Sequence, residues 1–163
     1  MTSNRAIHWI GAGLSSGPGI IALAQKWGEI TVWDMTLDRV QELKEHLSEE
    51  IKFHIHHLNL DDNQSKDLFC KNLNPGDVVI SMLPASFHVE VAKLALDHDC
   101  HMVTSSYLSE QMVTLNDEAM AKKLCIVNEV GLDPGIDHLL THILIDTARI
   151  AGQLGRGNLI DFT

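Results

Sequence analysis

The stretch Gly11-Ala12-Gly13-Leu14-Ser15-Ser16-Gly17-Pro18-Gly19 lies between an apolar segment, residues 6–10, and a segment of helical period. A glycine-rich turn in this place is typical of dinucleotide-binding domains, because the helix N-terminus offers free N–H groups to a pyrophosphate. We assign the tight turn to Gly11 and the close approach of backbone to phosphate to Gly13. Ser16 stands where the usual spacing has a third glycine, so we expect looser packing of helix on strand or an offset to Gly17. The alternative is a structural turn that binds no nucleotide.

Short apolar runs alternate with helical segments along the chain, which predicts parallel strands joined by crossover helices. The expected strands are residues 6–10, 29–33, 52–58, 77–82, 100–104 and 124–129. The expected helices reach residue 27 after the glycine turn and then cover 36–46, 61–73 with Asp61 as cap, 86–98, 109–123 and 136–151. The fourth strand is nearly all apolar, so we place it centrally. The predicted fold class is α/β, a Rossmann-like doubly wound parallel sheet of about six strands.

Composition indicates one globular core in 163 residues with small-molecule partners. A formal net charge of −10 argues against a nucleic-acid surface, and no apolar run reaches the length of a membrane span. Cys70, Cys100 and Cys125 lack metal or redox spacing, and we expect them to be reduced and buried. The short polar N-terminus favours a cytoplasmic location.

Asp34 ends the second strand, about twenty residues beyond the first glycines, where an acidic side chain accepts hydrogen bonds from the adenosine ribose. A carboxylate there repels the additional phosphate of NADP, and Met35 follows it instead of an arginine. We therefore predict NAD in preference to NADP, although Arg39, one helical turn further on, could reach a phosphate. The alternative role for Asp34 is an N-cap of the next helix.

Polar segments follow three later strands, and ligands of open parallel sheets bind at the carboxyl ends of strands. Leu83 and Pro84 end the fourth strand, and we assign them to the nicotinamide side. The hydroxyls after the fifth strand can donate to a substrate carboxylate, although Tyr107 could also be a surface aromatic. A dense set of polar and turn residues, 128–138, follows the sixth strand and indicates a functional loop.

In order and spacing, three segments resemble successive signatures of saccharopine dehydrogenases of the glutamate-forming type: Ser81-Met82-Leu83-Pro84, Val103-Thr104-Ser105-Ser106-Tyr107 and Asn128-Glu129-Val130-Gly131-Leu132-Asp133-Pro134-Gly135-Ile136-Asp137-His138. The resemblance implies an oxidoreductase of lysine metabolism. Such an enzyme oxidises saccharopine, a secondary amine joining lysine to glutarate, by hydride transfer to a nicotinamide cofactor. Hydrolysis of the imine then gives glutamate and aminoadipate semialdehyde.

The same resemblance implies roles for individual residues. Those expected to face the cofactor are Gly11, Ala12, Gly13, Leu14, Ser15, Ser16, Asp34, Met35, Thr36, Asn59, Leu60, Leu83 and Pro84. Ser106, Tyr107 and Asp133 are expected to face the substrate, with Asp133 and Tyr107 as the catalytic candidates. Asp133 is assigned to polar chemistry at the amine, and its alternative role is to cap the helix after Pro134. Family members usually prefer NADP and carry an arginine where Met35 stands.

The resemblance also implies a second domain that closes over the site and supplies basic residues. We expect residues 1–152 to form the cofactor domain and 153–163 to begin a truncated substrate domain, with 158–163 as its first strand. Exposed apolar surface would then favour a homodimer or association with a separate substrate domain. Two alternatives remain: a degenerate, non-catalytic NAD-binding module, and a polyamine-precursor enzyme of the carboxynorspermidine or homospermidine type.

Histidine pairs occur twice, but we predict no metal site. His54 and His56 share one face of the third expected strand without a third ligand. His138 and His142 are one helical turn apart and lack the glutamate of a zinc-protease motif.

Overall fold

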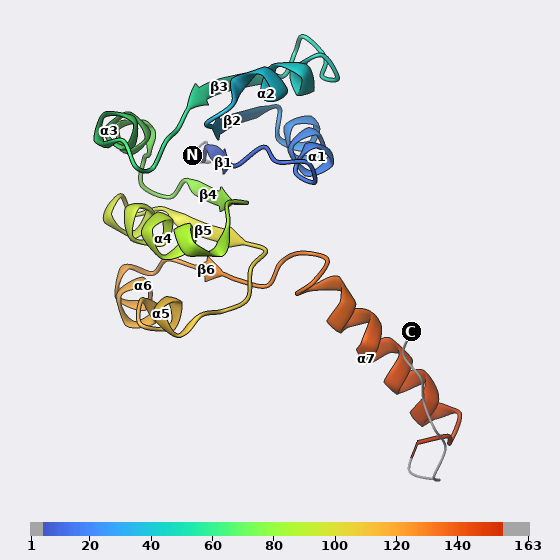
Figure 1. The fold of residues 1–163 in the computed structure, drawn as a ribbon. Coiled ribbons are helices and arrows are strands. Elements are labelled where there is room, and N and C mark those ends of the chain that lie inside the picture. Colours follow the sequence, from blue (N-terminus) through green and yellow to red (C-terminus); the bar gives the residue numbers. More distant parts are fainter. Residues whose placement is uncertain (1–4, 155–163) are drawn as a thin grey trace.

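The computed structural model describes residues 5–154 (Figure 1). Its strands are β1 (Ile7–Ile10), β2 (Glu29–Asp34), β3 (Lys52–His57), β4 (Val78–Ser81), β5 (His101–Thr104) and β6 (Ile126–Val127). Its helices are α1 (Gly17–Trp27), α2 (Leu37–Lys44), α3 (Asn63–Asn72), the short 3₁₀ helix η1 (Ala85–Phe87), α4 (His88–Asp97), α5 (Glu110–Val113), α6 (Asn116–Lys122) and α7 (Ile136–Ile150). The strand predicted at 158–163 lies outside the described residues.

All six strands pair in parallel, in the order β3-β2-β1-β4-β5-β6. The chain builds outward from β1 to β3, crosses back to β4 beside β1, and builds outward again to β6. Every residue of β1 is buried, as its central position requires. The predicted fold class is confirmed, and β4 has the central position predicted for it. A crevice is expected at the carboxyl ends of β1 and β4, where the strand order reverses.

Two layers of helices cover the sheet, with α1 and α2 on one face and α3 to α6 on the other (Figure 1). The side chains of β1 alternate between these layers, as the two-residue period of a strand requires. Trp9 packs in the cluster that contains Ile20 of α1, whereas Ile10 packs with Phe69 of α3 and Val91 of α4. The sheet therefore has a hydrophobic core on each face.

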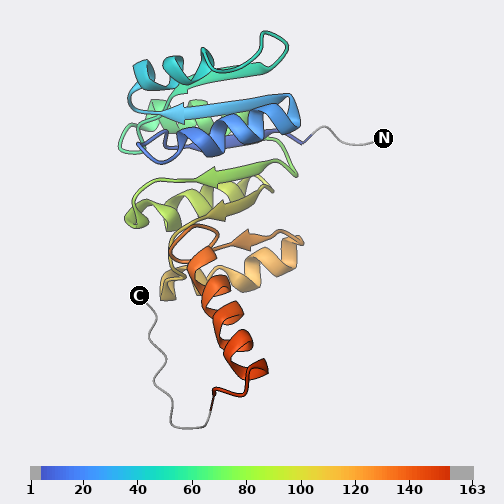
Figure 2. The ribbon, with the colours of Figure 1, turned by 90° about the vertical axis from the view of Figure 1, so that its right-hand side faces the viewer.

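Helix α7 leaves the body of the domain and extends away from the sheet (Figures 1 and 2). Its apolar side chains are exposed: Ile136, Leu139, Leu140, Ile143, Leu144 and Ile150. Among the helices of residues 5–154, none combines the length and apolar character needed to cross a membrane.

Several predicted boundaries are wrong in detail. Asp62, and not Asp61, caps α3, since its carboxylate accepts from the N–H groups of Gln64 and Ser65 at 3.2 and 3.3 Å. The helix predicted over 109–123 is divided into α5 and α6. The N–H of Leu115 bonds to the carbonyl of Met112 at 3.1 Å, and this tighter turn keeps both side chains in the core.

The remaining differences concern shorter elements and one thiol. The helix predicted over 86–98 begins as η1 and becomes α-helical at His88. Strand β6 has only two residues, both paired with β5. Cys100 is buried and Cys70 half-buried, but Cys125 is exposed, which corrects the prediction that all three thiols are buried.

A buried histidine–aspartate pair joins β1 to the turn before β4. His8 Nε2 lies 3.3 Å from Asp77 Oδ2, and both side chains are 4% exposed. Trp33 Nε1–H donates to His8 Nδ1 at 3.2 Å, so the ring proton lies on Nε2 and faces Asp77. Burial lowers the pKa of His8, with Asp77 opposing the shift. The core therefore favours an uncharged imidazole.

We expect the free energy of unfolding to fall as the pH decreases from about 7 to about 5. Burial is the largest cause that lowers the pKa of His8, His56 and His88 in the folded chain. An unfolded imidazole titrates near 6.5, so below that pH the unfolded chain binds protons that the folded chain excludes. Urea unfolding at several pH values measures the effect.

The matched variants are His8→Gln, which should flatten this pH dependence, and His142→Gln on the exposed side of α7, which should preserve it. A free energy of unfolding that stays constant between about pH 7 and 5 would contradict the assignment of buried neutral imidazoles.

Candidate functional site

The glycine turn is held at the carboxyl ends of β1, β2 and β4. The N–H of Gly11 donates to the carbonyl of Trp33 at 2.9 Å, and Met82 N–H donates to the carbonyl of Ile10 at 2.8 Å. Gly11 has φ +92°, and a Cβ there would lie 3.0 Å from the Met82 carbonyl oxygen. The turn therefore requires glycine at this position.

The other glycines of the turn have separate tasks. Gly13 is exposed, and a Cβ added there would meet no atom within 4 Å, which leaves its backbone open to a ligand. Ser16 is buried, and Pro18 lies in the first turn of α1 as predicted.

A Cβ at Gly19 would lie 2.8 Å from the Trp9 ring, so close packing of helix on strand occurs there. This corrects the expectation of looser packing or of an offset to Gly17, which instead faces Leu43.

Asp34 connects the end of β2 to the glycine turn. Its Oδ2 accepts from the N–H of Ala12 at 2.6 Å, and its Oδ1 accepts from the N–H of Thr36 at 2.7 Å. The N-cap of α2 is Thr36, without a side-chain capping bond, so the alternative of Asp34 as the helix cap is wrong. Each carboxylate oxygen keeps a lone pair for a further donor.

A pocket of about 240 Å³ opens beside Asp34. It is mostly apolar, and its lining residues are Ile10, Trp33, Asp34, Met35, Leu58, Asn59, Leu60, Asp61, Leu83, Pro84 and Phe87. Six residues predicted to face the cofactor meet in it: Asp34, Met35, Asn59, Leu60, Leu83 and Pro84. Leu83 and Pro84 line this pocket together with Asp34, and their assignment to the nicotinamide side stays a prediction.

The predicted substrate residues come from the loops after β5 and β6. Tyr107 is 61% exposed, and its hydroxyl donates to Asp133 Oδ1 at 2.5 Å. This hydrogen bond is the main cause that raises the pKa of Tyr107. The N-cap of α7 is Gly135, whose N–H is bound by Asp137 Oδ1 at 2.8 Å, so Asp133 is not the helix cap.

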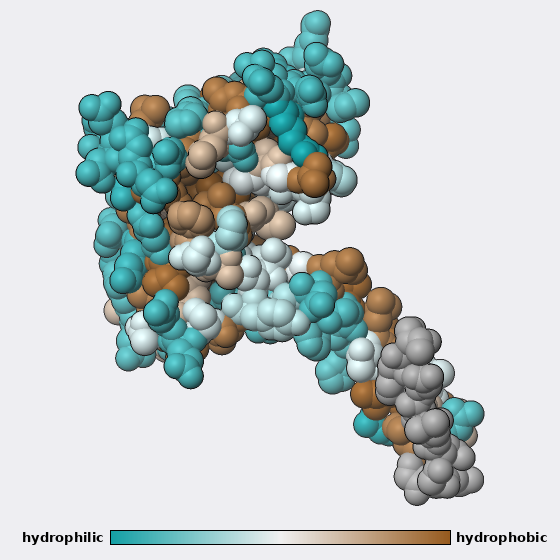
Figure 3. Space-filling model, viewed as in Figure 1, coloured by the Kyte–Doolittle hydropathy of each residue, from teal (hydrophilic) through white to brown (hydrophobic). Residues whose placement is uncertain are grey.

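Tight packing of the loop after β6 brings Asp133 to Tyr107. The N–H of Gly131 donates to the carbonyl of Pro134 at 3.0 Å. A Cβ added to Gly131 would lie 2.9 Å from Ser105 Cβ, so the two loops are in contact. The exposed face is hollowed between the α1–α2 half and α7 (Figure 3).

His88 is a polar residue at this edge that sequence reasoning did not identify. It is 4% exposed, and its Nε2 lies 2.7 Å from Ser106 Oγ. A histidine seven residues after Ser81, at the start of a helix, was the available signal, but only the fold shows that the two side chains meet.

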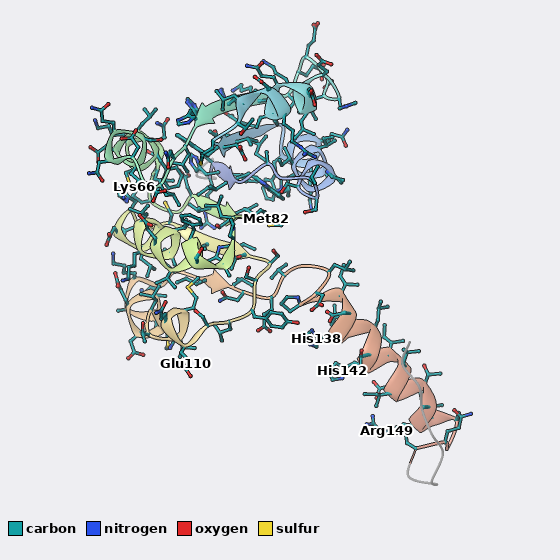
Figure 4. The ribbon with its side chains drawn as sticks, viewed as in Figure 1. Lys66, Met82, Glu110, His138, His142 and Arg149 are labelled. Atoms are coloured by element: carbon teal, nitrogen blue, oxygen red, sulfur yellow. The ribbon has the colours of Figure 1, made fainter. Side chains whose placement is uncertain are left out.

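His54 and His56, both on β3, contact different side chains. His56 stacks on Trp33 with ring centroids 4.6 Å apart, and His54 bonds to Glu29 at 3.2 Å. His138 and His142 lie on the same side of α7, beyond the edge of the sheet (Figure 4). Within residues 5–154, no group of three or more His, Cys, Asp or Glu side chains could hold a metal ion.

The parallel sheet, the glycine turn at its reversal point and the pocket beside Asp34 define a Rossmann-type dinucleotide-binding domain. The chain belongs to the family of the saccharopine dehydrogenase NADP binding domain, whose pattern matches residues 7–127. The resemblance seen in the sequence is thereby confirmed.

The relatives share most of this chain. Saccharopine dehydrogenase (NADP(+), L-glutamate-forming) of Pyricularia oryzae is 31% identical over 150 residues, which are 92% of this chain and 32% of the relative. The mitochondrial alpha-aminoadipic semialdehyde synthase of Rattus norvegicus is 31% identical over 153 residues, 93% of this chain and 16% of the relative. Apo saccharopine dehydrogenase (L-Glu forming) from Saccharomyces cerevisiae matches with a TM-score of 0.71 and 33% identity over 91% of this chain and 32% of that structure. The chain thus spans about a third or less of the length of these relatives.

We expect Gly11→Ala to lower the free energy of unfolding by about 1–3 kcal/mol, because the new Cβ meets the Met82 carbonyl at a positive φ. Gly13→Ala is the matched control, and its effect should stay within about 0.5 kcal/mol. Urea denaturation measures both. Equal losses in the two variants would contradict the special role given to Gly11.

Proposed function

We propose that this chain is the cofactor-binding unit of a saccharopine dehydrogenase-like oxidoreductase of lysine metabolism. The reaction is hydride transfer between NAD(P) and the secondary amine of saccharopine or a related amino-acid derivative. One observation carries the proposal: the pocket beside Asp34, which spans the reversal point, and the Tyr107–Asp133 pair, from the loops after β5 and β6, lie at the carboxyl edge of the same sheet.

The residues at this edge fit a dinucleotide. The apolar pocket walls suit an adenine ring, and the free lone pairs of Asp34 suit the ribose hydroxyls. The exposed backbone of Gly13, Leu14 and Ser15 precedes α1, where a pyrophosphate gains from free N–H groups and the helix dipole. A bound nicotinamide supplies the hydride acceptor.

Selectivity for NAD is the finer part of this proposal. Asp34 is an anion at the ribose position, and Met35 beside it is 65% exposed and uncharged. Arg39 Nη2 donates to the Leu14 carbonyl at 3.3 Å, which directs its guanidinium to the glycine turn. The matching family and the fungal relative are both named for NADP. We attribute the preference for NAD that we propose for this chain to Asp34 and Met35.

We expect a fluorescence titration to show tighter binding of NADH than of NADPH. Met35→Arg should strengthen NADPH binding about tenfold, because a charge-assisted hydrogen bond to phosphate contributes roughly 1.5 kcal/mol or more. Met120→Arg adds the same charge on an exposed residue of α6 and should change neither affinity. Tighter NADPH binding by the unmodified chain would overturn the role assigned to Asp34.

The Tyr107–Asp133 pair supplies proton chemistry at the amine. The Tyr107 phenol donates to Asp133, and this hydrogen bond raises the pKa of Tyr107. The second oxygen of Asp133 can accept a proton from the amine nitrogen as the C–N bond gains double-bond character. Asp133 would thus act as the base, with Tyr107 holding its orientation.

A separate substrate-binding unit completes this proposal. Saccharopine carries several carboxylates, yet the loops 105–109 and 128–136 contain no Lys or Arg and include Glu129 and Asp133. The exposed apolar side chains of α7, visible in Figure 3, offer a surface on which such a unit could pack. A second copy of the chain is the alternative occupant.

The same acidic loops favour the degenerate NAD-binding module as the second candidate. It would bind cofactor without turning over any substrate. The polyamine-precursor reaction has no separate support in the described residues.

We expect the chain alone to bind cofactor but to show no saccharopine-dependent reduction of NAD or NADP, because cationic partners for the carboxylates are missing from the loops. Absorbance at 340 nm measures the reaction, and the Asp133→Asn variant is the background. Turnover by the chain that Asp133→Asn abolishes would contradict the need for a second unit.

We also propose a reducing compartment, and the cytoplasm by preference. Cys70, Cys100 and Cys125 are all free thiols, as is usual in reducing surroundings.

A further inference from the structure

His88 connects the ends of two strands to the substrate loop. Its Nδ1 lies 3.0 Å from Ser81 Oγ at the end of β4, and its Nε2 lies 3.0 Å from Thr104 Oγ1 at the end of β5. The shortest contact, 2.7 Å, joins Nε2 to Ser106 Oγ. Ser81 and Thr104 are wholly buried, whereas Ser106 is half-buried and borders the open edge.

Hydrogen-bond requirements select one tautomer of the ring. The Ser81 hydroxyl is fully buried, and the acceptor that it meets is His88 Nδ1. A buried hydroxyl that does not donate loses a hydrogen bond, and Thr104 Oγ1 is buried as well. Nδ1 lies within reach of both hydroxyls, 3.0 Å from Ser81 Oγ and 3.4 Å from Thr104 Oγ1, whereas Nε2 could accept only from Thr104 of the two, so we assign Nδ1 as the acceptor. The proton then lies on Nε2 and is donated to Ser106 Oγ. Thr104 Oγ1 accepts the Ser106 N–H at 3.3 Å and also lies 3.4 Å from Nδ1.

We propose that His88 is a positioning residue that turns the Ser106 hydroxyl into a donor directed at a carboxylate of the substrate. Because Ser106 Oγ accepts the Nε2 proton, its own O–H is free to point to the open edge. The hydroxyl therefore recognises an anionic oxygen and not an amine N–H. The identity of the ligand in this inference rests on the proposed function, whereas the position of the proton on the His88 ring does not depend on it.

The surroundings of the ring maintain this arrangement. In the part of the chain that the structure describes, the side chains bonded to His88 are hydroxyls from β4, β5 and the following loop. An imidazolium would have no lone pair for Ser81, and burial lowers the pKa of His88 accordingly. The hydrogen bonds from Ser81 to His88 and from His88 to Ser106 therefore keep the same donors and acceptors at neutral pH.

Two-bond ¹H–¹⁵N correlation spectra of the histidine-labelled chain test the proposal directly. At pH 7.5 we expect His88 to show the pattern of an Nε2-protonated neutral ring, with its signals identified by their loss in His88→Gln. Ser106→Ala should shift Nε2 more than Nδ1, and Ser81→Ala should do the reverse. An Nδ1-protonated or doubly protonated ring would overturn the proposal, and this measurement requires no ligand.

A second measurement follows the Ser106 amide signal during titration with saccharopine. His88→Gln places an amide N–H near the position of Nε2 and should retain the response of the unmodified chain. The shorter side chain of His88→Asn cannot place an N–H near the position of Nε2, and this variant should weaken saccharopine binding about tenfold or more. Equal responses in both variants would overturn the positioning role.

The two measurements separate the two hypotheses. If the ring has the expected tautomer, and the Ser106 amide responds to glutarate but not to saccharopine, His88 positions Ser106 for a carboxylate and the proposed substrate is wrong. If neither carboxylate shifts the Ser106 amide in the unmodified chain, the role of His88 in carboxylate recognition is also wrong.

Discussion

The close approach of Gly11 to the main chain of Met82 determines the shape of the ligand edge. Gly11 has φ +92°, and the Met82 carbonyl leaves no room for a Cβ. These two constraints fix the direction in which the main chain leaves β1. Hydrogen bonds from Gly11 to β2 and from Met82 to β1 join three strand ends at this point. The carboxylate of Asp34 then accepts a hydrogen bond from the N–H of the residue after Gly11, Ala12, and holds it in place. The phosphate-facing backbone is therefore organised before any ligand arrives, which reduces the entropy cost of binding.

Much of this arrangement could be predicted from the sequence because it depends on local patterns. The alternation of apolar runs and helical segments specifies a parallel sheet, and the glycine turn marks where the order reverses. Asp34 ends β2, whereas Asn59 and Leu83 follow β3 and β4, and a shared carboxyl edge brings them into one pocket.

Contacts between distant residues account for what the sequence could not specify. Gly19 provides the close helix–strand contact because Trp9 happens to face it across the layer. The break between α5 and α6 serves the burial of Met112 and Leu115, which a helical period does not reveal. His88 gains its importance from Ser106, eighteen residues away in sequence, and no local motif indicates that they meet.

The two halves of the edge differ in chemistry. The β1–β3 half offers backbone N–H groups and, together with the residues after β4, an apolar pocket, which suit a dinucleotide. The loops after β5 and β6 offer hydroxyls and carboxylates, which suit an amine but give an anionic substrate little charge compensation. The proposed substrate-binding unit would supply that charge, and the exposed apolar side chains of α7 would be its docking surface.

The most direct test of the central claim is a map of the cofactor contact from ¹H–¹⁵N correlation spectra of the backbone during titration with NADH. We expect the largest shifts at Gly13, Ser15, Met35 and Leu60, with smaller shifts at Ser106, and none along α7. Shifts confined to other surfaces, or no shifts with either NADH or NADPH, would contradict the assignment of this edge to a nicotinamide dinucleotide.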